Sequence, residues 1–435
     1  MMKIIISLCL LLSAGSAGAL DFNGDFVSEF RSALAETPPP AAGPAAPTLP
    51  EWTVMVFING KNDLANFGQA DLVEMECYGS TRNMKVVVEL GLFKKGVRRY
   101  FVRGNGNSSG PGSELLADLG SPDMGDWRHL AEFGKWAKAA YPAKRYMLVV
   151  WNHGSGWVSN KGAAQNKGIS YDDETRNHIS TPELAQAMKE IGKVDILAMD
   201  ACLMQMAEVA YEVRDYAGHI LASEETAPGQ GLPYDLALAA VDDLAARPAA
   251  EIGSAIVRDY IRGYSRPGKE QKATLSLLNA AALPRLAELS DAWAGAALAY
   301  PDKQKLRDAA NGAAAYTIDE YKDLCDLAER VADATADPAL AEKGEALCAF
   351  IRGALVEANG ATSRMGSGSN GISVYVSRDG ASERYRALDF AKATRWDDFL
   401  AALPRYYPPP PPPNPFDPLD PLDPENWRSG GAPLR

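Results

Sequence analysis

Unbroken runs of apolar residues recur along the first half of the chain. They lie at 52–58 (WTVMVFI), 84–90 (MKVVVEL), 145–151 (RYMLVVW) and 194–200 (VDILAMD). Such runs are typical of strands that are covered on both faces, whereas half-exposed strands alternate between apolar and polar residues. Because helical stretches separate the runs, the pattern predicts an α/β fold with a mostly parallel central sheet.

Two helices are expected between these strands, at 65–80 and at 126–142. In the second, Leu130, Phe133 and Trp136 recur at helical spacing. The polar, glycine-rich segment 105–112 (NGNSSGPG) has a strand-like stretch on either side and therefore predicts a hairpin.

The second half of the chain has a different pattern. From about 250 to 355 it is rich in alanine and leucine, which predicts helices. One further strand is expected at 371–377 (GISVYVS), and after it an amphipathic helix that contains WDDFLAAL. We interpret 51–245 as the core of the protein and 246–407 as a C-terminal subdomain that packs on the core or completes it.

Both ends of the chain differ in composition from the middle. Residues 1–19 resemble a secretory signal, with one lysine before a short apolar core and an A-x-A motif at the end. Residues 20–50 have the composition of a short pro-like segment and a Pro/Ala-rich linker, and residues 408–435 that of a Pro-rich tail outside any core. We therefore expect an exported bacterial protein that is secreted, periplasmic or held at the cell surface.

Composition narrows the class of protein further. The 435 residues are 46% apolar and carry a net charge of −12, which argues against a surface for nucleic acid or anionic membranes. An acidic protein favours cationic substrates instead. After the signal, no apolar stretch is long enough to span a membrane, and we expect a monomer.

The five cysteines do not form a disulfide scaffold or paired CxxC metal ligands. Cys9 lies in the signal, which leaves Cys77, Cys202, Cys325 and Cys348. A bridge between Cys325 and Cys348 stays open at this stage.

His153 and Cys202 each come directly after an apolar strand. Functional groups of parallel α/β sheets gather beyond the carboxyl ends of the strands, so both side chains are expected in one crevice. The pattern also predicts that Cys202 starts a helix with Met206 and Val209 on one face, and a helix N-terminus lowers the pKa of a thiol. A nearby imidazole then supplies acid–base catalysis, and the N–H groups of Gly154 and Cys202 can form an oxyanion hole.

Four sequence blocks give these residues a family context: VVWNHGSGW, ISYDDE, DILAMDACLMQMAEVAYE and ASEETAPGQGLPYD. They resemble the motif blocks of the clostripain-like cysteine peptidases, within the caspase, gingipain and legumain group. The likeness is strong over about 52–240 and weaker over 315–400.

The resemblance implies a caspase-like α/β/α sandwich with a helical C-terminal subdomain. It implies a Cys–His dyad of Cys202 and His153, and cleavage of proteins or peptides after arginine or lysine. Asp200 matches the acidic residue that binds the basic side chain of the substrate, as a buried carboxylate can.

The same resemblance implies further assignments. Asp172, Asp173, Glu224 and its neighbour Glu225 are candidates for lining the cleft. The polar segment 159–170 is a candidate for self-cleavage, with Lys167–Gly168 as the bond. The chemistry requires no cofactor; calcium dependence varies among relatives, and the sequence contains no EF-hand loop.

Two other functions compete with this prediction. GNSSG around Ser108 fits the nucleophile motif of serine esterases, but Pro111 and Gly112 come after it where a helix is needed. An exported binding protein with an inactive peptidase fold is the second alternative. What argues against it is the complete set of His153, Gly154, Asp200 and Cys202.

Overall fold

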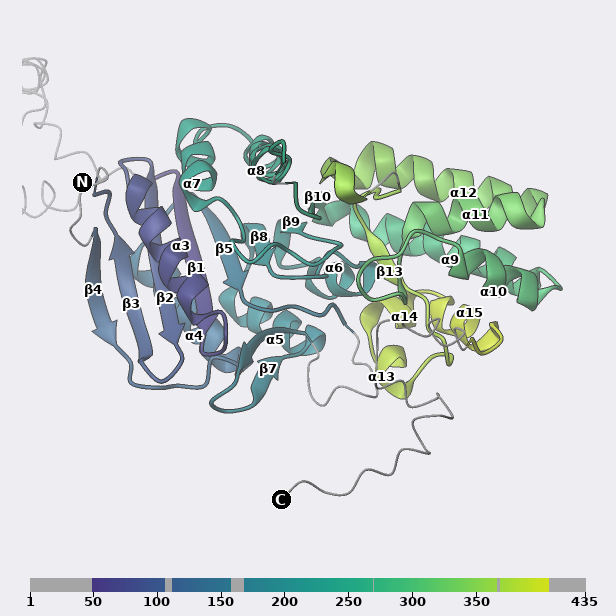
Figure 1. Ribbon diagram of the computed structural model, residues 1–435, viewed down its shortest axis with the longest axis horizontal. Helices are drawn as coiled ribbons and strands as arrows, with labels where there is room; N and C mark the ends of the chain where they lie inside the picture. The colour runs from purple at the N-terminus through teal and green to yellow at the C-terminus, as the bar shows by residue number, and fades with distance from the viewer. Residues whose placement is uncertain (1–48, 106–111, 158–167, 269, 366–367, 407–435) are drawn as a thin grey trace, which may run out of the picture. The chain divides into compact units, whose positions relative to one another are not determined.

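A nine-stranded sheet forms the centre of the protein (Figure 1). The computed structural model describes residues 49–105, 112–157, 168–268, 270–365 and 368–406. From one edge to the other the strands are β12 (Val356–Ala361), β10 (Thr274–Asn279), β9 (Ala217–Ala222), β8 (Val194–Asp200), β5 (Arg145–Trp151), β1 (Trp52–Gly60), β2 (Met84–Leu92), β3 (Gly96–Val102) and β4 (Ser113–Asp118). The five strands from β9 to β2 are parallel, and the outer pairs are antiparallel.

Helices cover both faces of this sheet, which explains the unbroken apolar runs. Along β1, Met55 and Phe57 belong to one core, whereas Val54 and Val56 belong to the other, because successive strand residues point to opposite faces. The first core includes α4 (Trp127–Ala140), α5 (Thr181–Ile191) and α6 (Ala207–Val213). The second includes α3 (Ala65–Tyr78), α7 (Tyr234–Asp243) and α8 (Ala249–Tyr264). The predicted α/β/α sandwich is confirmed.

The hairpin and the helices that were expected around the first strands are present. β3 and β4 pair antiparallel, and α3 and α4 lie within the stretches with helical periodicity. Ser108 lies outside the described residues, as do the predicted signal, the linker before residue 49 and the Pro-rich tail.

The second half of the chain contains more strands than the sequence predicted, among them β11 (Tyr321–Asp323) and β12. The region predicted to be helical contains β10, whose six residues TLSLLN are too short a run to be told from a helix by periodicity. The strand expected at 371–377 is β13 (Ser373–Tyr375), which pairs with β11 in a separate two-stranded sheet. Because β10 pairs with β9, the subdomain contributes strands to the central sheet.

The remaining elements are mainly helices of this C-terminal part. They are α9 (Leu283–Ala299), α10 (Lys303–Asn311), α11 (Leu324–Thr335), α12 (Pro338–Phe350), α13 (Glu383–Arg386), α14 (Asp389–Ala393) and α15 (Trp396–Ala402), together with the small sheet of β6 (Ile169–Asp172) and β7 (Asn177–Ile179). Cys325 and Cys348 are free thiols between α11 and α12, and the Cys348 thiol donates to the Cys325 carbonyl oxygen at 3.5 Å. Among the described residues, no helix combines the length and apolar character needed to cross a membrane.

Candidate active site

His153 and Cys202 lie just beyond two strands that are side by side in the sheet. In the parallel pair of β5 and β8, Trp151 and Asp200 are register partners. His153 and Cys202 each come two residues after these partners, so both leave the sheet at the same edge. This edge is the carboxyl end of the parallel strands, where α/β proteins hold their ligands.

Cys202 lies in a loop and does not start a helix. The next helix, α6, begins at Ala207 with Met206 as its N-cap, five residues after the cysteine. The prediction that a helix N-terminus lowers the pKa of the thiol is therefore wrong. Residues 203–206 are held by tertiary contacts instead, because Leu203 N–H donates to the Glu225 carbonyl oxygen (3.1 Å) and Gln205 N–H to that of Ser223 (3.0 Å).

Burial dominates the electrostatics of the thiol. It raises the pKa of Cys202, and the negative charges of Asp200 and Glu225 act in the same direction. Two backbone donors oppose this effect: Ala227 N–H, 3.2 Å from Sγ, and Gly154 N–H. The balance favours the protonated thiol of Cys202 over the thiolate.

Gly154 is required by the close approach of the loops after β5 and β8. A Cβ atom at this position would lie 2.4 Å from the Cys202 carbonyl oxygen and 2.9 Å from Ala201 Cβ. Only glycine lets the two backbones pass so closely. The N–H of Gly154 is thereby fixed beside the sulfur.

Gly154→Ala is therefore expected to lower both stability and activity. We expect a loss of about 1–3 kcal/mol in the free energy of unfolding, as for other overpacked sites. We also expect at least a tenfold lower rate of the peptide hydrolysis that the sequence resemblance implies. Thermal unfolding and initial rates measure the two effects. Gly263→Ala is the control, because a Cβ there meets no atom within 4 Å; an equal effect in this control would contradict the argument.

Asp63 is a site residue that the sequence reasoning missed. Its Oδ1 lies 2.7 Å from Nε2 of His153. Asp63 comes after β1, which is the parallel neighbour of β5 on the side away from β8. The sequence did contain a signal for Asp63, since it is a polar residue just beyond the end of a third apolar strand.

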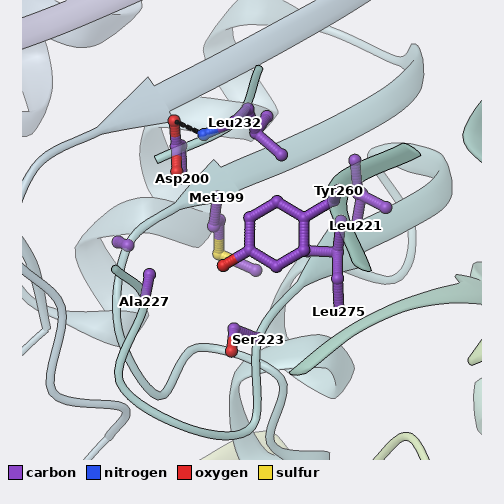
Figure 2. Close-up of a pocket in the computed structure, with 9 residues that line it drawn as sticks. Met199, Asp200, Leu221, Ser223, Ala227, Leu232, Tyr260 and Leu275 are labelled. Atoms are coloured by element: carbon purple, nitrogen blue, oxygen red, sulfur yellow. Dashed lines mark hydrogen bonds between the residues drawn. The ribbon is translucent and has the colours of Figure 1, made fainter. Parts of the chain in front are cut away.

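Asp200 lies in a small pocket beside the cysteine (Figure 2). The pocket is lined by Met199, Asp200, Ala201, Leu221, Ser223, Ala227, Leu232, Tyr260 and Leu275. In Figure 2 the ring of Tyr260 lies in the middle of these residues. The free space is about 10 Å³, room for one water molecule, so a long side chain enters only after these residues move.

The carboxylate of Asp200 is held by two hydrogen bonds. Leu232 N–H and Tyr234 O–H both donate to Oδ2 at 3.0 Å. Burial raises the pKa of Asp200 to about 6, although these donors favour the charged form. Gly231, with φ +57, lets the chain pass over the carboxylate, since a Cβ there would lie 2.6 Å from Oδ2.

Two carboxyl groups of α3, those of Asp71 and Glu74, interact with Asp200. Burial raises the pKa of Asp71 to about 9 and that of Glu74 to about 7, and the charge of Asp200 acts in the same direction for both. Neither residue was singled out from the sequence, because both are spaced like ordinary residues of an amphipathic helix. A cation beside these carboxyl groups would favour their charged forms.

The other acidic candidates have different surroundings. Asp172 is buried in an ion pair with Lys61 (2.9 Å) and accepts Met124 N–H (3.0 Å). Asp173 is exposed in the turn after β6. Glu224 is buried away from these residues, where Tyr316 O–H donates to it at 2.7 Å. None of the three lines the pocket of Asp200.

The predicted cleavage bond lies at the border of the described chain. Lys167 is outside the described residues, whereas Gly168, the next residue, accepts Ser155 N–H at 3.0 Å through its carbonyl oxygen.

The sequence predicted no metal site and left a dependence on calcium open. Within the described part of the chain, no three His, Cys, Asp or Glu side chains are grouped as metal ligands.

Comparisons with known proteins give the site at this edge of the sheet a family context. A model of the clostripain family matches residues 56–403. Clostripain of Hathewaya histolytica is 27% identical over 213 residues, 42% of this chain and 40% of that protein. The match spans about two fifths of the length of this curated relative.

Solved structures share the fold over most of the described chain. A secreted C11 cysteine protease from Bacteroides thetaiotaomicron, in complex with an irreversible peptide inhibitor, aligns with a TM-score of 0.62 and 20% identity. An inactive zymogen C11 protease from Parabacteroides distasonis aligns with a TM-score of 0.61 and 18% identity. Each comparison covers 80% of this chain and 99% of the other.

Proposed function

Because the chain belongs to the clostripain family, we propose that it is a cysteine endopeptidase with Cys202 as nucleophile and His153 as general acid and base. The register that pairs Trp151 with Asp200 is the main support for this proposal, because it brings His153 and Cys202 to one edge of the sheet. The Gly154 N–H beside the thiol supports it further.

The proposed reaction begins with transfer of the thiol proton to His153. Nε2 of His153 faces Asp63, so Nδ1 is the nitrogen that takes the proton. Sγ attacks the peptide carbonyl carbon, and the N–H groups of Gly154 and Cys202 stabilise the oxyanion. The C–N bond then breaks as His153 returns the proton to the leaving amine. Water, deprotonated by His153, hydrolyses the thioester and restores the thiol.

Specificity for arginine or lysine is assigned to Asp200. A buried carboxylate pairs with guanidinium at two points or with ammonium as a point charge. With a pKa of about 9, Asp71 is neutral at pH 7, so the negative potential of the pocket comes from Asp200 itself and in part from Glu74. Asp172 and Glu224 already bind other groups of the protein, so we keep them out of the substrate contacts.

Asp63 is proposed to orient His153. In Asp63→Asn we expect kcat to fall about tenfold with KM unchanged, because the amide holds the ring less firmly while the substrate pocket is intact. Steady-state kinetics separate the two constants. Asp215→Asn, a change of the same charge in an exposed turn, serves as control, and a rise in KM alone would contradict the orienting role.

Self-processing at Lys167–Gly168 is an expected consequence of the proposed specificity. The ends of this segment are joined at its base, where Ser155 and Gly168 are hydrogen-bonded, so the fold persists after a cut. Amino-terminal sequencing of the exported protein is expected to give a fragment that starts at Gly168, absent in Cys202→Ala. One uncut chain in the active protein would contradict this.

A panel of fluorogenic peptides tests the proposal as a whole. Peptides that end in Arg, Lys, Leu or Asp are incubated with the full exported chain, with and without calcium or a chelator. We expect turnover of the Arg and Lys peptides by a monomer in both conditions, since the proposed chemistry uses side chains alone. No turnover of any peptide would favour the inactive binding protein instead.

A further inference from the structure

A second pocket, of about 550 Å³, lies between α5 and α13 and is independent of Asp200. Its walls include Trp157, Thr181 and Leu388, and two arginines, Arg176 and Arg384, belong to the same lining. The indole of Trp157 packs edge-on against Tyr375 and Tyr385, so the apolar wall is firmly supported.

The two arginines lack ion-pair partners within the described ranges, although acidic residues are close in sequence. Glu383 is paired with Arg386 at 3.0 Å, and Asp389 with Lys392 at 3.4 Å. Both Arg176 and Arg384 are exposed. On a chain of net charge −12, a pocket with two such cations is suited to an acidic and partly apolar ligand.

A segment of the same chain has this chemistry. PFDPLDPLDPE, residues 415–425, carries four acidic side chains and no basic one. Its residue types repeat every three positions, which equals one turn of polyproline II helix. In that conformation Asp417, Asp420 and Asp423 share one face, and Phe416 and its apolar counterparts share another.

The chain leaves the described fold near this pocket. Tyr406, the last described residue, donates its N–H to the Arg378 carbonyl oxygen at 3.1 Å. Arg378 comes three residues after Tyr375, which contacts Trp157. From Tyr406 to Phe416 an extended Pro-rich chain covers about 31 Å at ~3.1 Å per residue, which is ample to reach the pocket.

We propose that this pocket is the docking site of the chain's own segment 415–425. The apolar face packs against Trp157, Pro182 and Ala387, as Pro-rich segments do in aromatic grooves. The aspartate face pairs with Arg176 and Arg384. The docked tail thus lies next to Trp157. Trp157 comes directly before the stretch 158–167, which contains Lys167 of the proposed cleavage site.

Site-specific photo-crosslinking in the full-length chain tests this proposal without using enzyme activity. Phe416 is replaced by p-benzoylphenylalanine, and the crosslinked peptides are identified by mass spectrometry. We expect intramolecular crosslinks to peptides that contain Thr181 or Leu388, with a yield independent of protein concentration. Crosslinks only to other regions, only between two chains, or none at all would each overturn the proposal.

Charge reversal supplies the matched variants. Arg176→Glu with Arg384→Glu is expected to reduce the crosslink yield at least fivefold, whereas Arg82→Glu, an exposed arginine before β2, leaves it unchanged. The combined changes Asp417→Lys, Asp420→Lys and Asp423→Lys should restore the yield in the double variant. Thermal unfolding checks that each variant is folded, and an unchanged yield in the folded double variant would overturn the role of the arginines.

Discussion

Cys202→Ala is expected to abolish peptide hydrolysis, with kcat lowered by about 10⁴-fold or more, as when other nucleophiles of this type are removed. The reason is that no other group can form the thioester, while the fold is little changed by the loss of one half-buried sulfur. Initial rates with an Arg peptide measure the effect. Cys77→Ala, which removes an exposed thiol of α3, should keep full activity.

The raised pKa of Cys202 adds a pH dependence to this prediction. Alkylation by iodoacetamide requires the thiolate, so its rate at Cys202 is expected to rise about tenfold per pH unit between pH 6 and 8. Mass spectrometry of the alkylated peptides measures the rate, with the exposed Cys77 as internal reference. A rate that is constant over this range would indicate a preformed thiolate and contradict the effect of burial.

Asp200→Asn is expected to reduce kcat/KM for Arg and Lys peptides by about 10²–10³-fold, which corresponds to roughly 3–4 kcal/mol for one charged partner lost from a buried pair. Turnover of Leu peptides should change little. The amide still accepts hydrogen bonds from Leu232 and Tyr234, so the pocket keeps its shape. Asp195→Asn, at the other end of β8, is the control. A matching loss in that variant would point to sheet stability rather than specificity.

The pKa of Asp200, about 6, sets the sign of the pH effect. Below this value the carboxyl is neutral and no longer attracts a cation. The ratio of kcat/KM for Arg over Leu peptides is expected to fall about tenfold from pH 7 to pH 5. A ratio constant over this range would exclude Asp200 as the specificity group.

Because of the same residue, the stability of the fold should change with pH in the opposite direction to the specificity. Burial raises the pKa of Asp200 in the folded state, so its contribution to stability is largest below the unfolded pKa and is lost as pH rises through about 6. At pH 8 the Tm of Asp200→Asn is therefore expected to equal or exceed that of the parent. The proposed binding of a basic side chain would offset this cost in the parent only when substrate is present.

The sequence predicted those features that depend on a single strand and the residues just after it. The apolar runs located β1, β2, β5 and β8, and the polar residues after two of them located His153 and Cys202. Features that depend on the order of strands in the sheet were missed. Asp63 contacts His153 because β1 lies beside β5, an arrangement that sequence order does not give.

Local propensity failed where tertiary contacts replace it. Residues 203–206 have helix-forming side chains in helical register, yet the N–H groups of Leu203 and Gln205 bind the carbonyl oxygens of the chain after β9. Leu203 even adopts a positive φ of +63, which a non-glycine residue takes only under constraint. The same explanation holds for β10, whose leucines pair with β9 rather than form a helical turn.

The burial of Cys202 also bears on how long an exported enzyme of the proposed kind would last outside a cell. Peroxide attacks thiolates far faster than thiols, and the first product leads on to irreversible sulfinic and sulfonic acids. Extracellular media hold no glutathione pool to reverse the damage. Ala227 N–H lies 3.2 Å from the Cys202 sulfur, and a thiol that stays protonated reacts slowly with such oxidants. The resting protein is therefore expected to keep its activity in aerated buffer without reductant, and to lose it mainly while turning over.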